Sequence, residues 1–130
     1  MLQFTYTIFY VKDVVQSIEF YEKAFGLQRK FIAPNEEYGE LLTGTTTIGF
    51  ASLEMADTNI PLELEVSNTT KKTLGMEIGF VATDVPAAMQ QALDAGAILV
   101  AEPKQKPWGQ TVGYIRDLNG FLVELCTAME

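Results

Sequence analysis

The chain of 130 residues contains no histidine. Its absence excludes catalytic systems that depend on an imidazole, such as Ser-His-Asp and Cys-His nucleophiles, and zinc sites ligated by histidine. Cys126 is the only cysteine, so no disulfide can form within the chain. Its position in the apolar run FLVELC favours a packed, unreactive thiol. The lack of an internal disulfide fits a reducing compartment, and we expect a cytoplasmic protein.

Positive charge is also scarce. Nine Lys and Arg residues stand against 17 Asp and Glu, which gives a net charge of −8. Because nucleic-acid binding needs clustered Lys and Arg, we expect no nucleic-acid partner. The acidic balance suits solubility and is compatible with a cationic ligand. No apolar run approaches the ~20 residues that span a bilayer, and the N-terminus lacks the pattern of a signal peptide, so no membrane association is expected.

One sequence pattern occurs twice. It begins at Tyr6 as YTIFYVKDVVQSIEFYEKAFGL and again at Glu77 as EIGFVATDVPAAMQQALDAGAIL. Each copy opens with an apolar run that predicts a strand. Asp13 in the first copy and Asp84 in the second then stand where a helix N-cap belongs. A glycine closes each helical stretch, and the same sequence distance separates the two first residues and the two caps.

Three strand-like runs follow each predicted helix. They read LQRKFIA, EYGELLT and TTTIGFASLE in the first half, and AILVAE, TVGYIRD and FLVELCT in the second. The last two are joined through LNG, where Asn-Gly predicts a tight turn. Each half therefore has the order β-α-β-β-β. We predict one α+β domain over 1–130, with modules at 1–54 and 75–130 and a linker at 55–74.

This layout resembles the vicinal oxygen chelate superfamily, which includes lactoylglutathione lyases, extradiol dioxygenases, fosfomycin-resistance enzymes and bleomycin-resistance proteins. The resemblance rests on VKDVVQSIEFYEKAFGL, YGELLTGTTTIGFAS and PKQKPWGQTVGYIRDLNGFLVEL, and on the duplication. It implies two βαβββ modules that form a curved mixed sheet around a cup. It also implies a homodimer, built about a two-fold axis.

In the metal-dependent members, four His, Gln or Glu ligands come from the first and last strand of each module. Carried over to this chain, the four positions are Tyr6, Gly49, Glu77 and Glu124. Glycine has no side-chain ligand and a neutral phenol is a poor one, so we predict no metal and no other cofactor. Glu77 and Glu124 each interrupt an apolar strand. Either they point to solvent or pair with Lys or Arg, or they share an inward-facing site.

The departure from a metal site resembles the bleomycin-resistance branch, in which the cup holds a ligand without a metal. We therefore predict a protein that sequesters an amphipathic or cationic small molecule. The candidate ligand-binding residues are Tyr6, Phe50, Glu77, Trp108, Tyr114, Phe121 and Glu124. For Trp108, the only tryptophan, the alternative is that it packs the loop PKQKPWGQ onto the sheet.

Two competing hypotheses follow from the same residues. The first is a metal-dependent lyase or isomerase of the glyoxalase type, or a dioxygenase-like enzyme, with Glu77 and Glu124 as its catalytic residues. A metal-free enzyme that uses one of these carboxylates as a base is a variant of it. The second is an interaction module whose cup is filled by its own side chains.

Overall fold

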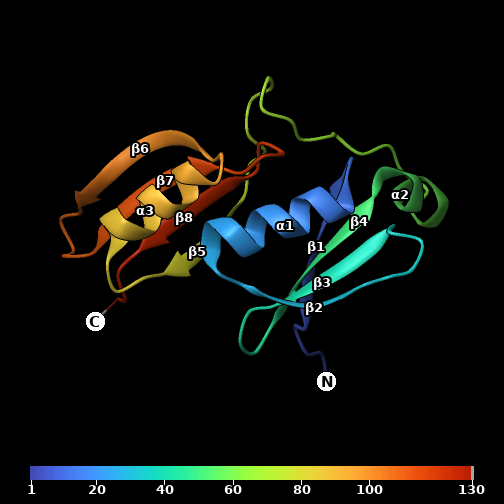
Figure 1. The fold of residues 1–130 in the computed structure, drawn as a ribbon, viewed down its shortest axis with the longest axis horizontal. Coiled ribbons are helices and arrows are strands. Elements are labelled where there is room, and N and C mark those ends of the chain that lie inside the picture. The colour runs from blue at the N-terminus through green and yellow to red at the C-terminus, as the bar shows by residue number, and fades with distance from the viewer. Residues whose placement is uncertain (130) are drawn as a thin grey trace. The chain divides into compact units, whose positions relative to one another are not determined.

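A computed structural model describes residues 1–129. The chain divides into two compact units, Met1–Val66 and Ser67–Glu130, each of which contains one module. The first contains β1 (Tyr6–Val11), α1 (Val14–Phe25), β2 (Gln28–Ile32), β3 (Tyr38–Leu42), β4 (Thr47–Ser52) and α2 (Leu53–Asn59). The second contains β5 (Glu77–Val81), α3 (Val85–Asp94), β6 (Ile98–Gln105), β7 (Thr111–Arg116) and β8 (Leu122–Cys126). The predicted β-α-β-β-β order and the α+β class are confirmed (Figure 1).

Each module has its own four-stranded mixed sheet. The strand order is β1-β4-β3-β2 in the first sheet and β5-β8-β7-β6 in the second. In both sheets the first strand of the module pairs in parallel with the last, and the other pairings are antiparallel. The two sheets therefore repeat one topology.

The main helices begin and end where the sequence predicts. The Asp13 carboxylate accepts the backbone N–H of Gln16 at 3.0 Å, and the Asp84 carboxylate accepts that of Ala87 at 3.0 Å. Both satisfy a backbone donor that a helix start leaves without an intrahelical partner. α1 ends at Gly26, whose φ of 68° lies in the left-handed region that glycine adopts at little cost.

One helix covers one face of each sheet. In the first module, Tyr21 of α1 is fully buried and packs edge-on against Phe50 of β4, with ring centroids 5.0 Å apart. In the second, Met89 of α3 lies over Gly113 of β7. Side chains alternate along a strand, so the residues before and after Phe50 or Gly113 point away from the helix. We call the face of each sheet that points away from its helix the open face.

The predicted linker contains an ordered helix and an anchored segment. α2 begins after Ser52, whose hydroxyl accepts the N–H of Met55 at 3.0 Å. Further along, the Arg116 guanidinium donates to the Asn68 carbonyl at 3.0 Å, and the Ser67 hydroxyl donates to the Asn119 carbonyl at 2.9 Å. The chain from Ser67 onward is thus fixed to the turn after β7. Within residues 1–129, no helix is long and apolar enough to cross a bilayer.

Candidate ligand-binding site

Each open face contains a row of three neighbouring residues across its strands, and the row in one module corresponds to the row in the other. Residues directly opposite one another on neighbouring strands share a face. The row reads Ile8, Gly49 and Glu40 in the first module, and Gly79, Glu124 and Tyr114 in the second. This register agrees with the alignment of the sequence repeat, in which Gly49 and Glu124 occupy the same position.

Three predicted site residues meet on the open face of the second module. Glu77 lies close enough to Glu124 that Glu124 influences its pKa, and the Tyr114 hydroxyl donates to Glu124 Oε1 at 3.2 Å. Partial burial raises the pKa of Glu77, and the hydrogen bond and negative charge of Glu124 raise it further. Both effects favour the protonated form of Glu77 relative to an isolated Glu. We call Glu77, Glu124 and Tyr114 the carboxyl cluster.

The thiol of Cys126 lies beside this cluster. Burial is the main cause that raises its pKa, and the neighbouring Glu124 raises it further. A thiol is a nucleophile only as its thiolate. Cys126 is therefore suited to packing and not to covalent catalysis, as the sequence predicted.

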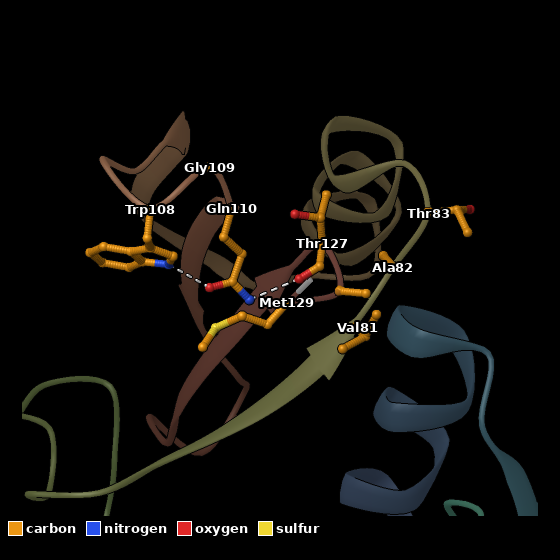
Figure 2. Close-up of a pocket in the computed structure, with 9 residues that line it drawn as sticks. Val81, Ala82, Thr83, Trp108, Gly109, Gln110, Thr127 and Met129 are labelled. Carbon is orange, nitrogen blue, oxygen red and sulfur yellow. Dashed lines mark hydrogen bonds between the residues drawn. The ribbon is translucent and has the colours of Figure 1, made fainter.

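Trp108 stands beside a cavity of about 520 Å³ at one end of the same sheet. Its indole is 63% exposed, but its position is fixed. Nε1–H donates to Gln110 Oε1 at 2.8 Å, and Gln110 Nε2 donates to the Thr127 carbonyl at 2.8 Å (Figure 2). Trp108 is therefore held by its polar edge while much of the ring is accessible, unlike a tryptophan that packs a loop onto a core.

The lining of this cavity is uncharged throughout the described residues. The lining residues are Val81, Ala82, Thr83, Trp108, Gly109, Gln110, Thr127, Ala128 and Met129. A cavity of this volume matches those that hold a single small molecule. We call it the tryptophan pocket.

A bare strip of backbone separates the tryptophan pocket from the carboxyl cluster. Glu77 and Val81 both lie on the open side of β5, about 13 Å apart at the usual rise per residue. Gly79 lies between them, and a Cβ built there would meet no heavy atom within 4 Å. The strip between the two features is therefore open.

The first module places Tyr6 and a different set of polar groups on its open face. Tyr6 is 54% exposed at the start of β1. The Tyr38 hydroxyl donates to Glu40 Oε2 at 2.6 Å, and Lys30 Nζ lies 3.3 Å from Glu40 Oε1. Sequence reasoning missed this group because EYGELL reads as an acidic strand end. The alternation of Tyr38 and Glu40 with Gly39 and Leu41 could have revealed it.

Two predicted ligand-binding residues lie elsewhere. Phe50 faces α1 and is fully buried against Phe9 and Tyr21, so it belongs to the core of the first module and not to the open face. The alternation of side chains explains this, because Gly49 beside it points to the open side. Phe121 precedes β8, next to the turn where its N–H donates to the Asp117 carboxylate at 2.9 Å. Phe121 is half-buried and lies just before the first residue of β8, whereas Cys126 is the last residue of that strand.

The model of one protein family, described as a glyoxalase-like domain, matches residues 4–130. The chain belongs to this family. The glyoxalase-like family lies within the vicinal oxygen chelate superfamily that the sequence resembles, so this prediction is confirmed.

Curated relatives of this glyoxalase-like chain come from mycobacteria. It is 30% identical over 113 residues to Mb0911c, an uncharacterised protein of Mycobacterium bovis, and the match covers 85% of this chain and 73% of that one. It is equally identical to Rv0887c, an uncharacterised protein of Mycobacterium tuberculosis, of whose length it spans 65%.

Solved structures share the glyoxalase-like fold at low identity. A glyoxalase-related enzyme from Fulvimarina pelagi has a TM-score of 0.85 at 18% identity, over 98% of this chain and 89% of that one. TioX from Micromonospora has a TM-score of 0.70 at 20% identity, over 97% and 98%. These similarities show the fold and leave the function to the site.

The four positions that hold a metal in glyoxalase-like relatives do not fit one here. A Cβ at Gly49 would lie 2.8 Å from the Tyr38 hydroxyl, so the place of a ligand side chain is filled. Burial and Glu124 raise the pKa of Glu77, which opposes the deprotonation that a metal ligand needs. Among residues 1–129, no group of three or more His, Cys, Asp and Glu side chains could hold a metal ion.

Proposed function

We propose that this protein binds and sequesters an amphipathic small molecule on the open face of its second module, without a metal and without chemical change. The observation that carries the proposal is the fixed, exposed indole of Trp108 at an uncharged pocket, joined by an open strip to a carboxyl cluster. This arrangement offers an apolar surface and a polar anchor on one sheet.

The chemistry of the two ends defines the ligand. A planar apolar group fits against the Trp108 ring, whose polar edge is already hydrogen-bonded. A cationic end fits the carboxyl cluster, where Glu124 accepts from Tyr114. Gly79 supports this orientation because it leaves space for the atoms that join the two ends. The family resemblance to bleomycin-resistance proteins points in the same direction.

The single tryptophan provides the test. Its indole N–H gives one resonance in a ¹H–¹⁵N spectrum. The probe is (5-phenylpentyl)trimethylammonium, in which a chain joins an aromatic ring to a cation, with neutral 5-phenylpentan-1-ol for comparison. We expect a saturable shift of this resonance with the cation and a weaker response to the alcohol. Gly79→Val fills the strip on an unobstructed strand position and should weaken binding of the cation about tenfold, or about 1.4 kcal/mol.

Gly75→Val is the matched control, because a Cβ at Gly75 also meets no atom within 4 Å but the residue precedes β5. It should leave binding unchanged. If the indole resonance shows no saturable shift, or if Gly79→Val binds the cation as wild type does, the proposal is wrong.

One observation favours a second function, an enzyme of the lyase or isomerase type. Glu77 and Glu124 lie together in the carboxyl cluster and the pKa of Glu77 is raised by burial and by Glu124, and such a pair can act as general acid and base. The two functions differ in what leaves the site. A sequestered ligand is recovered with its mass and stereochemistry unchanged, whereas turnover alters it, and dependence on added Mn²⁺ would favour the metal-dependent form.

We also propose that the protein forms a homodimer. β1 and β5 are edge strands of their sheets, and proteins usually cover or protect such edges. Closed two-fold dimers are the commonest oligomers. Light scattering at micromolar concentration should give twice the chain mass of 14.4 kDa, and a stable monomer would refute the dimer.

A further inference from the structure

Each module has the same tight turn at the tip of one hairpin. The hairpin of β2 and β3 turns through residues 33–36, APNE, and that of β6 and β7 turns through residues 106–109, KPWG. In each turn the N–H of the fourth residue donates to the carbonyl of the first at 2.8 Å. Proline at the second position favours this geometry. The two tips thus share a backbone frame and differ in their side chains.

Glu36 occupies the fourth position of the first turn in a strained conformation. Its φ is 60°, and within residues 1–129 it is the only residue other than glycine with a positive φ. The corresponding residue of the second turn is Gly109, at φ 97°, which adopts such angles at little cost. The Glu36 side chain is exposed, and it makes no hydrogen bond or ion pair with the described part of the chain. A strained residue whose carboxylate has no use in its own fold indicates a partner outside it.

The tip of the second hairpin surrounds a surface cavity of about 550 Å³, which we call the basic cavity. It shares only Gly109 with the tryptophan pocket. The lining residues are Lys104, Gln105, Lys106, Pro107 and Gly109. Neither Lys104 nor Lys106 makes an ion pair or a side-chain hydrogen bond within residues 1–129. Two of the nine basic residues of an acidic chain thus line one cavity without an acidic partner among the described residues.

We propose that the basic cavity of one chain receives the Glu36 tip of a second copy of this chain. This contact rests on the homodimer proposed above and names one of its surfaces. Two chains of net charge −8 repel one another, so their association needs a local contact between opposite charges. The chain supplies both halves of this contact, and a two-fold axis would form it twice in each dimer.

Sedimentation equilibrium measures the dissociation constant of the dimer. Glu36→Gln keeps the length of the side chain and removes its charge. It should raise the dissociation constant up to about 25-fold, which is about fivefold for each of two exposed ion pairs. Glu36→Lys and Lys106→Glu, each alone, bring like charges together and should weaken the dimer further. Glu63→Lys and Lys72→Glu are the matched controls, because they make the same charge changes at exposed positions outside both tips, and should match wild type.

Glu36→Gly separates association from the stability of the turn. It removes both the carboxylate and the strain of the positive φ. It should raise the urea midpoint of the dilute, monomeric chain and still weaken the dimer as Glu36→Gln does. A Glu36→Gly chain that associates as tightly as wild type would contradict the proposal.

A mixture of the two charge-reversed variants shows which chains are in contact. In a mixed dimer of Glu36→Lys with Lys106→Glu, one contact joins two unchanged residues and the other joins two exchanged charges. The equimolar mixture should therefore associate more tightly than either variant alone. If the mixture stays as weak as its components while a chain with both substitutions associates like wild type, the tip binds the cavity of its own chain and the proposal fails. If wild type is a dimer and Glu36→Gln leaves its dissociation constant unchanged, the tip contact is wrong and the homodimer stands, whereas a monomeric wild type would overturn both.

Discussion

The two modules place a glycine on different strands of the same row. In the first, Gly49 of β4 lies opposite Ile8 of β1, and in the second, Gly79 of β5 lies opposite Glu124 of β8. The space above Gly49 is filled by the Tyr38 hydroxyl and Ile8, whereas the space above Gly79 is open. The duplicated backbone thus retains its register, while the different placement of the glycine leaves an open strip in the second module and a filled one in the first.

The negative charge of the carboxylates on the open face is offset in a different way in each module. Glu40 faces the ammonium of Lys30, which neutralises it by opposite charge. The pKa of Glu77 is raised by burial and by Glu124, so protonation of one of these two groups relieves their repulsion.

The largest difference in stability between matched substitutions in the two modules is expected at the turns that precede their last strands. Gly44 and Gly120 both have positive φ, at 91° and 87°. A Cβ at Gly44 meets no atom within 4 Å, but one at Gly120 would lie 2.6 Å from the backbone of Asn68. Gly44→Ala should therefore cost about 1 to 2 kcal/mol, for backbone strain alone. Gly120→Ala should cost about 3 kcal/mol or more, because the anchored segment must also move.

Urea unfolding of the two variants checks this comparison. A larger loss of stability in Gly120→Ala, with chemical-shift changes at Ser67 and Asn68, is the expected result. Equal losses would mean that the segment after Ser67 is not held against the turn. Arg116→Lys should cause a smaller loss of stability than Gly120→Ala, since it removes part of the hydrogen bonding to Asn68 and Gly120 without backbone strain.

Local signals in the sequence predicted the frame of both modules. A helix start at Asp13 or Asp84 depends on one side chain and a backbone N–H three residues away, and a stop at Gly26 depends on one φ angle. Such interactions lie within a few residues. The repeat then carried the assignment from one module to the other, and the strand register agrees with it.

The details of the site depend on contacts between residues distant in sequence. Trp108 is fixed through Gln110 to Thr127, which belongs to another segment. Lys30 reaches Glu40 across a register shift that no propensity indicates. Phe50 is different, because strand alternation alone would have placed it opposite to Gly49 and in the core. The prediction that Phe50 binds a ligand followed from its aromatic ring and not from the alternation of side chains along β4.

A second comparison tests the packing above the two glycines in the shared row. Gly49→Ala brings a Cβ to 2.8 Å from the Tyr38 hydroxyl and 3.3 Å from Ile8, and should cost about 1 to 3 kcal/mol through overpacking. Gly79→Ala meets open space and should be neutral or stabilise by up to about 1 kcal/mol, because the unfolded chain loses freedom. Adding Tyr38→Phe should recover part of the loss at Gly49. Denaturant midpoints measure all three, and an equal loss at both glycines would contradict the difference in packing.

The smallest effect concerns the charges of the two carboxyl sites. The pKa of Glu77 is raised in the folded protein, so its contribution to stability is fully present below the ordinary value of about 4.3 and is lost as pH rises through the raised value. Glu77→Gln cannot lose a proton. It should therefore be more stable than wild type at neutral pH, by less than about 1 kcal/mol for a group so near the surface, and the difference should vanish toward pH ~4.

Glu40→Gln should instead be less stable than wild type, with a loss of about 1 kcal/mol at neutral pH, because Lys30 and Tyr38 lose a charged acceptor. Urea unfolding of wild type and Glu77→Gln across this pH range, and of Glu40→Gln at neutral pH, measures these differences. A Glu77→Gln variant that is less stable than wild type at neutral pH would show that the Glu77 carboxylate is stabilised in the fold and that its pKa is not raised.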